Sequence, residues 1–166
     1  HPFLDGNGRI GRLSLVLLMI HWNLLPLPLL YLSAYFHRHR QTYYDLLLAV
    51  SEQGLWHDWL HFFLRGVTEQ ADDAIQRARN LQDLSQTWQE QLQTDRTTGH
   101  MFSVMHYLFE QPIVSANDVI QRLSVGHQAA MQTLRRLESM GITEEITGKQ
   151  RNQRFVAVGI LKVLES

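Results

Sequence analysis

The chain has 166 residues, of which 45% are hydrophobic, and a formal net charge of −1 at pH 7. This balance excludes a strong overall field that would direct the whole chain to nucleic acid or to a membrane surface. The chain contains no cysteine, which excludes disulfides and thiolate metal sites. The length suffices for one good core or two small ones. A reducing compartment is compatible with this composition, so we expect a cytoplasmic protein without a membrane span.

The first twelve residues, HPFLDGNGRIGR, hold the densest group of chemically active side chains. Gly6 and Gly8 allow positive φ angles and bring bare backbone N–H groups against a ligand, so the turn can form an anion-binding nest. A helix that begins near Gly8 points its positive end at the same place. Arg9 and Arg12 lie three residues apart and share a helix face, from which both can reach phosphate oxygens.

A carboxylate and an imidazole complete this stretch. Asp5 is the only carboxylate beside the cationic cluster, and such a carboxylate is suited to hold Mg²⁺ together with phosphate oxygens. His1 can accept a proton near neutral pH. These residues predict a nucleotide-phosphate site with a general base. A purely structural glycine turn is the alternative, whereas a calcium loop would need further acidic ligands.

The same stretch resembles the motif of the Fic/DOC family, H-x-F-x-D/E-G-N-G-R-x-x-R. Every fixed position of that motif is filled, by His1, Phe3, Asp5, Gly6, Asn7, Gly8, Arg9 and Arg12. Most members of the family transfer AMP from ATP to a hydroxyl group of a target protein. The resemblance therefore implies a protein adenylyltransferase with ATP as co-substrate and Mg²⁺ as metal. Removal of AMP, or use of another nucleotide donor, also occurs in this family.

The resemblance also implies a role for each residue of the motif. His1 would deprotonate a Ser, Thr or Tyr hydroxyl of the target, and Asp5 would ligate Mg²⁺. Gly6, Asn7 and Gly8 would cradle the phosphates, and Arg9 and Arg12 would neutralise their charge. Phe3 would anchor the loop in the core.

Fic domains place this loop between two helices, with further helices, a target-clamping hairpin and, in many members, an inhibitory helix on the N-terminal side. Because the chain starts at the motif histidine, it resembles the C-terminal half of a Fic domain. We expect this half alone to be inactive.

Helical patterns continue after the motif. The apolar run 13–25 predicts a buried central helix that ends before Pro26, and the run 41–50 predicts a second helix that stops at Gly54. By resemblance to Fic proteins, a tyrosine of this region would lie near the adenine. Tyr43 and Tyr44 are the candidates, and because adjacent helical residues face different ways, we expect at most one to line the pocket. An aromatic core is the alternative.

A long amphipathic helix is predicted from Trp56 to about Leu92 by apolar residues at spacings of three and four. His57 and His61 are spaced for a metal, but no third ligand is evident, so we treat them as surface residues. The polar segment 94–99 marks a domain boundary. We therefore expect a Fic-like domain with its connecting helix over 1–94 and a second domain over 95–166.

The second domain is predicted to contain three short helices. The first spans 102–109, and the second is capped by Ser115, has Asp118 at the capping-box position and ends at Leu123. Ser124 is the expected cap of the third, and Gly141 its C-terminal stop.

Two alternating stretches, 142–147 and 154–158, predict a β-hairpin after these helices. Three helices and a hairpin make a winged helix, and the string RRLESMGITEEITG resembles that family. The expected fold class is therefore mainly α, with the C-terminal part of an all-helical Fic domain and a C-terminal winged helix-turn-helix domain of α+β type.

Winged helices often bind DNA through the third helix, so DNA is a candidate partner. The side chains available on that helix and on the wing are His127, Gln128, Gln132, Arg135, Lys149, Arg151 and Arg154. Residues 95–166 hold 8 Lys and Arg against 7 Asp and Glu, a balance of +1, which is a weak basic footprint. Recruitment of a target protein and formation of a homodimer are the alternatives for this domain. The alternative function for the whole chain is a DNA-binding transcriptional regulator with a nucleotide-sensing or vestigial Fic motif.

Overall fold

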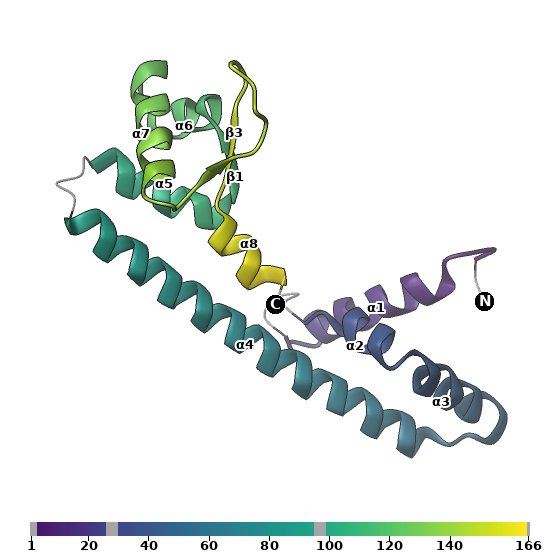
Figure 1. Ribbon diagram of the computed structural model, residues 1–166. Helices are drawn as coiled ribbons and strands as arrows, with labels where there is room; N and C mark the ends of the chain where they lie inside the picture. Colours follow the sequence, from purple (N-terminus) through teal and green to yellow (C-terminus); the bar gives the residue numbers. More distant parts are fainter. Residues whose placement is uncertain (1–2, 26–29, 95–98, 166) are drawn as a thin grey trace. The chain divides into compact units, whose positions relative to one another are not determined.

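The computed structural model describes residues 3–25, 30–94 and 99–165 (Figure 1). The chain forms two compact units, His1–Gln76 and Arg77–Ser166. The division falls inside helix α4 (Trp56–Thr94), the long amphipathic helix that the sequence predicts. We predicted the polar segment 94–99 as the domain boundary. Residues 95–98 of that segment lie outside the described residues.

The first unit consists of α1 (Asn7–His21), α2 (Leu32–Arg38), α3 (Arg40–Gln53) and the first part of α4. Gly6 begins α1 with a φ of 78°, and Gly54 ends α3 with a φ of 68°, as the glycine pattern predicts. The positive φ expected at Gly8 is wrong, because Gly8 lies inside α1 with helical geometry. The core of this unit is largely aromatic. The Tyr35 ring contacts Phe62 of α4 at a tilt of 43° with ring centroids 5.0 Å apart, and the centroids of the Phe36 and Tyr43 rings lie 4.8 Å apart. These ring contacts hold α2 and α3 against α4.

A close approach between α2 and α4 depends on Gly66. A Cβ atom placed on Gly66 would lie 2.5 Å from Cδ1 of Tyr35, a distance that real Cβ atoms do not reach. Since Tyr35 is 2% exposed, its ring has no open space to move into. The glycine is therefore required by packing in the middle of a helix, where glycine is otherwise unfavourable.

Two sequence-based expectations about burial are wrong for this unit. The predicted helix α1 forms, but none of its residues is buried: Leu17 is 56% exposed, and Trp22, the C-cap residue that follows the helix, is 61% exposed. The reason is geometric: Val16 and Met19 pack against the aromatic core, and the described elements cover only that face of the helix. Phe3, expected to anchor the loop in the core, is 51% exposed.

The second unit consists of the last part of α4 followed by α5 (Gly99–Glu110), β1 (Ile113–Ser115), α6 (Ala116–Leu123), α7 (His127–Ser139), β2 (Glu144–Glu145), β3 (Arg154–Val156) and α8 (Val158–Glu165). The three strands form an antiparallel sheet in the order β1-β3-β2. Three helices, the strand after the first and the hairpin after the third give the predicted winged-helix arrangement. The fold class, mainly α with a winged helix-turn-helix, is confirmed.

The core of the second unit is mainly aliphatic and closed. Leu108, Leu134 and Phe155 are fully buried, one each from α5, α7 and β3. Trp88 and Leu92 bring α4 into the same cluster. The helix α4 thus contributes apolar surface to the core of the winged helix.

Local signals in this unit are partly confirmed. The capping box forms: the Asp118 backbone N–H donates to Ser115 Oγ, and the Ser115 backbone N–H donates to Asp118 Oδ2 at 2.7 Å. The expectation that Ser124 caps the third helix is wrong. Ser124 ends α6 in the left-handed region, with a φ of 53°, and Gly126 is the N-cap of α7.

The strands are also shorter than the alternating stretches suggested. The sequence did not indicate β1, whose Val114 pairs with Phe155 of β3. A three-residue strand between two helices offers too little alternation to be recognised.

Candidate nucleic-acid interface and candidate phosphate site

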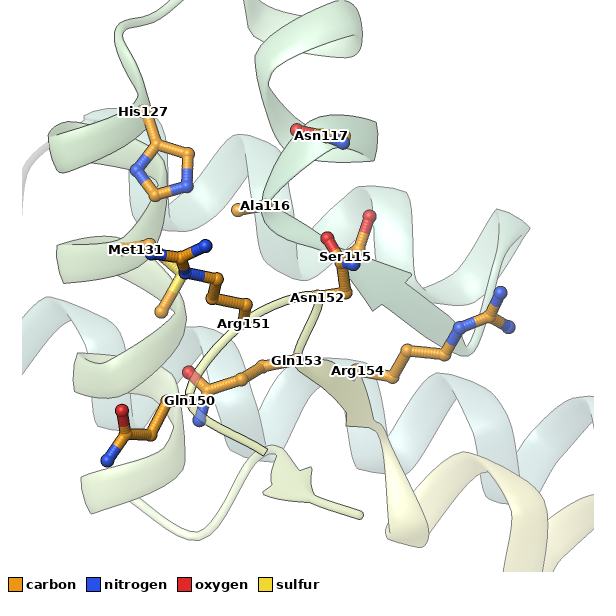
Figure 2. A pocket seen from close by; sticks show the side chains of 10 residues that line it. All are labelled: Ser115, Ala116, Asn117, His127, Met131, Gln150, Arg151, Asn152, Gln153 and Arg154. Atoms are coloured by element: carbon orange, nitrogen blue, oxygen red, sulfur yellow. The ribbon is translucent and has the colours of Figure 1, made fainter. Parts of the chain in front are cut away.

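A groove of about 560 Å³ opens between α7 and the wing, the segment 146–153 that joins β2 to β3. Figure 2 shows it lined from three sides: by α7, by the start of α6 and by the wing. The lining residues are Ser115, Ala116, Asn117, His127, Met131, Gln150, Arg151, Asn152, Gln153 and Arg154. The helix-turn-helix brings the N-terminal ends of α6 and α7 to the same groove.

The groove is locally basic although the domain as a whole is nearly neutral. Its lining contains Arg151 and Arg154 together with His127, and none of the residues that line it is acidic. Figure 2 shows Arg151 reaching from the wing toward Met131 of α7, whereas Arg154 points away from α7. A concave surface with cations and neutral donors around it suits a polyanion such as nucleic-acid backbone.

The structure brings together three of the seven residues predicted for DNA binding. His127, Arg151 and Arg154 line the groove. Gln128 and Gln132 are exposed on α7 outside the lining, as is Lys149 on the wing. Arg135 is also on α7, but its guanidinium is engaged by other groups of the domain.

Sequence reasoning missed the other polar residues of the groove. Asn117 faces it from the second position of α6, and Gln150, Asn152 and Gln153 face it from the wing. Their sequence signal is their place alone: the first turn of the second helix and the hairpin loop flank the third helix in any winged helix.

An open cavity of about 750 Å³ in the first unit contains the predicted phosphate loop. Its lining residues are Leu4, Asp5, Gly6, Asn7, Gly8, Arg9, Arg12, Tyr43, Tyr44, Leu47, Leu48 and Ser51. All of the residues predicted to bind phosphate, metal or adenine therefore meet in one cavity. The predicted base, His1, lies outside the described residues.

Local hydrogen bonds give the phosphate loop its shape. Asn7 Nδ2 donates to the Phe3 carbonyl at 2.6 Å, and Asn7 Oδ1 accepts from the Phe3 backbone N–H at 3.1 Å. Asp5 Oδ1 accepts from the Gly6 N–H at 2.6 Å, and Asp5 Oδ2 lies 3.5 Å from Arg9 Nη2. The Asp5 side chain is 94% exposed, so both carboxylate oxygens remain accessible to a cation.

Both tyrosines line this cavity, although we expected at most one. Tyr43 is 9% exposed and belongs to the aromatic core, while Tyr44 is 51% exposed with the Arg40 guanidinium 5.6 Å from its ring centroid. Tyr43 and Tyr44 also share a smaller neighbouring pocket with Arg12. Tyr43 therefore belongs both to the predicted aromatic core and to the cavity, whereas Tyr44 belongs to the cavity alone.

A loop that presents a carboxylate, two arginines and backbone N–H groups has the donor set that a magnesium nucleotide requires. Asp5 is the only acidic residue in the lining, and no group of three or more metal-ligating side chains occurs elsewhere among the residues that the structure describes. Any divalent cation here would depend on phosphate oxygens for further ligands. The carboxylate, the arginines and the backbone N–H groups of this cavity therefore fit a magnesium nucleotide.

Across residues 3–25, 30–94 and 99–165, no helix combines the length and the apolar character that crossing a bilayer requires. Residues 101–161 match the model of a protein family described as HTH DNA binding domain. The match begins in the first turn of α5 and ends inside α8. It therefore includes every residue that lines the groove. Residues 101–161 of the second unit thus form a helix-turn-helix domain that is similar to the family described in those words.

Proposed function

We propose that the chain is a DNA-binding regulator whose winged-helix domain holds duplex DNA across the groove between α7 and the wing. The observation that carries the proposal is the basic groove lined by His127, Arg151 and Arg154, within the segment that matches a DNA-binding family. The near-neutral charge of the domain does not oppose it, since the acidic side chains lie outside the groove lining.

In this proposal α7 enters the major groove, and its exposed residues face the base edges. His127, Gln128 and Gln132 lie on that exposed surface. A glutamine amide can donate to and accept from one adenine, so Gln128 and Gln132 suit sequence readout. Arg151 and Arg154 contact phosphates, which position the domain without specifying sequence.

The salt dependence of binding tests this arrangement. The intact protein is titrated into a labelled random-sequence duplex of about 30 base pairs at several salt concentrations between about 50 and 200 mM. Affinity should fall linearly with the logarithm of salt concentration. Arg151→Gln and Arg154→Gln should each weaken binding and reduce the slope by about 1.

Lys162→Gln is the matched control, because it removes the same charge from exposed α8, outside the groove. Its slope should equal that of the unchanged protein. Absence of duplex binding, or equal slopes for all variants, would refute DNA binding through this groove.

A second candidate function concerns the first unit. We infer that the glycine loop binds a magnesium nucleotide and, by its resemblance to Fic proteins, transfers AMP from ATP to a hydroxyl of a target protein. The specific support is the single cavity that collects Asp5, Arg9, Arg12 and both tyrosines. Its volume of about 750 Å³ lies within the range of small-molecule sites.

The transfer would proceed by attack of the hydroxyl oxygen on the α-phosphorus, with loss of the bond to the β-phosphate and release of pyrophosphate. His1 would take the hydroxyl proton, and Arg9 and Arg12 would stabilise charge on the departing phosphates. Asp5 would hold Mg²⁺ against the phosphate oxygens. If the loop only senses nucleotide, these residues bind it but no transfer follows.

Nucleotide binding and transfer are measured separately. Equilibrium dialysis of the intact protein with ATP and Mg²⁺ should show binding that weakens about tenfold or more in Arg12→Gln, because a charge-assisted bond is lost. Arg38→Gln, which removes an exposed charge outside the cavity lining, is the control.

Label transfer from ATP that disappears in His1→Ala would support the transferase. In the full-length protein, binding without transfer would support the sensor. Absence of nucleotide binding would refute both.

A further inference from the structure

The Arg135 side chain lies beside the groove but makes its contacts within the domain. Its Nη1 donates to Glu138 Oε2 at 2.7 Å, and its Nη2 donates to Gln153 Oε1 at 2.9 Å. The guanidinium also lies 5.3 Å from the ring centroid of the buried Phe155. A phosphate contact by Arg135 would compete with this short ion pair.

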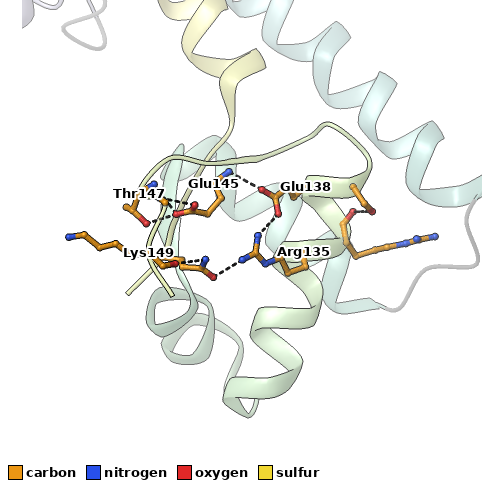
Figure 3. Close-up of polar contacts among 9 residues, drawn as sticks. Arg135, Glu138, Glu145, Thr147 and Lys149 are labelled. Carbon is orange, nitrogen blue, oxygen red and sulfur yellow. Dashed lines mark hydrogen bonds and ion pairs between the residues drawn. The ribbon is translucent and has the colours of Figure 1, made fainter. Parts of the chain in front are cut away.

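The two partners of Arg135 extend the contacts to both sides of the wing (Figure 3). On one side, Glu138 Oε1 accepts from the backbone N–H of Glu145 at 3.1 Å, at the end of β2. On the other side, Gln153 Nε2 donates to the Lys149 carbonyl at 2.7 Å, inside the wing. Arg135 therefore joins the middle of α7 to the beginning and the end of the hairpin loop.

The backbone ladder of the wing is too short to fix its position. Strands β2 and β3 pair over two residues, and one more bond, from the Ile146 N–H to the Arg154 carbonyl at 3.0 Å, closes the ladder. Residues 147–153 have no strand partner in the structure. Side-chain contacts must therefore hold the loop that carries Arg151 against α7.

Glu145 orders the turn at the start of that loop. Its carboxylate accepts from the hydroxyl and the backbone N–H of Thr147 and from the Gly148 N–H. These bonds hold the pKa of Glu145 below its ordinary value, the Thr147 hydroxyl being the largest cause. The turn and the Arg135 contacts together define one polar network from α7 through the wing.

We propose that Arg135 and Glu138 form a latch that positions the wing for DNA, and that Arg135 is a positioning residue rather than a contact to DNA. The inference rests on the proposed DNA binding. The latch sets the distance between α7 and Arg151, so that both meet one duplex. Loss of either partner leaves the wing mobile, and binding must then order it.

Glu138→Gln tests the latch most sharply, because electrostatics and positioning predict opposite results. The substitution removes a negative charge near the groove, so electrostatics alone predicts tighter binding to DNA. The latch predicts weaker binding, by about threefold to tenfold, because an amide replaces the ion pair with Arg135. The assay is the same random-sequence duplex titration with the intact protein.

Three further variants complete the design. Arg135→Gln should weaken binding by a similar factor and leave the salt slope unchanged, whereas Arg151→Gln should lower the slope by about 1. Glu144→Gln makes the same charge change on β2 outside the latch and should not weaken binding. Backbone amide exchange of residues 145–148 should accelerate in Glu138→Gln and Arg135→Gln only.

Tighter or unchanged binding by Glu138→Gln would overturn the latch, as would a slope reduced by about 1 in Arg135→Gln. If the circular dichroism spectrum of Arg135→Gln shows that this variant is unfolded, the near-isosteric Glu138→Gln variant alone decides whether the latch exists. Failure of the unchanged protein to bind the duplex refutes the proposed function itself and is seen before any variant is measured.

Discussion

The two units of the chain differ in what surrounds their sites. In the first unit an aromatic core covers one face of α1 and leaves Leu17 and Trp22 exposed, while the phosphate loop lies at the start of the same helix. In the second unit a closed aliphatic core fixes three helices and a sheet, and the groove lies on its surface. The first unit carries a dense chemical motif on a partly covered scaffold, and the second carries a well-covered scaffold without any such motif.

This difference shows that two kinds of sequence information are separable. A phosphate loop is recognised from a few consecutive residues, because backbone N–H groups and arginines act locally. A winged helix is recognised from the periodicity of its elements, because its core is collected from distant positions. The first kind of information indicates chemistry and the second indicates architecture.

The largest expected effect comes from matched truncations of a leucine in each unit. Leu134 is fully buried and Leu17 is 56% exposed, although both lie on helices. Leu134→Ala should lower the free energy of unfolding of the second unit by about 2 to 5 kcal/mol. Leu17→Ala should change that of the first unit by less than about 0.5 kcal/mol.

Native-state hydrogen exchange measures the two units separately, which a single melting curve does not. A large loss of protection in Leu17→Ala would mean that the exposed face of α1 is covered in solution, and the contrast between the units would disappear.

A glycine pair tests the aromatic packing of the first unit. Gly66→Ala places a methyl group against the Tyr35 ring, so we expect a loss of about 1 to 3 kcal/mol in the unfolding free energy of this unit. Gly11→Ala is the control, because Gly11 is also helical but a Cβ there meets nothing within 4 Å. It should be neutral or stabilise the helix by up to about 1 kcal/mol. Native-state hydrogen exchange of the first unit distinguishes the two variants, and equal protection in both would contradict the close approach.

Much of the second unit was predictable because its local signals agree with its packing. Ser115 and Asp118, three residues apart, predict a capped helix, and the capping box forms. Gly141 was predicted to stop α7, and it follows that helix with a φ of 74°. The failures arise where several conformations fit one residue type. Ser124 suits an N-cap by composition, yet the turn between α6 and α7 places it in the left-handed region and leaves the N-cap to Gly126.

The candidate sites show the same limit. Tyr43 and Tyr44 of α3 line the same cavity as the phosphate loop at the start of α1, and no local sequence pattern encodes this proximity. Arg135 has the side chain and helix position of a DNA contact. Only the three-dimensional arrangement of Glu138 and Gln153 shows that its guanidinium is already engaged.

Two serines of the second unit, Ser115 and Ser124, give a smaller test of how local signals act. Ser115→Ala should destabilise this unit by about 1 kcal/mol, because the Asp118 backbone N–H loses its acceptor. Ser124→Gly should stabilise it by up to about 1 kcal/mol, because glycine adopts the left-handed conformation without steric strain. Native-state hydrogen exchange of the second unit measures both changes. Destabilisation by Ser124→Gly would indicate that Ser124 does act as an N-cap.

The smallest expected effect concerns pH and the wing. Since the hydrogen bonds from Thr147 and Gly148 lower the pKa of Glu145, the folded state binds a proton less readily than the unfolded state. The stabilisation is therefore fully present above the ordinary value of 4.5 and is lost as the pH falls through the lower folded value. The amide chemical shifts of Thr147 and Gly148, followed by NMR during acidification, should change as Glu145 takes up its proton. In Glu145→Gln, which has no carboxyl group at this position, this change should be absent. Glu144→Gln, beside it on β2, should follow the unchanged protein. A wing that keeps its amide shifts at acidic pH would show that Glu145 does not organise the turn, and the latch would then have to hold the wing through Glu138 and Gln153 alone.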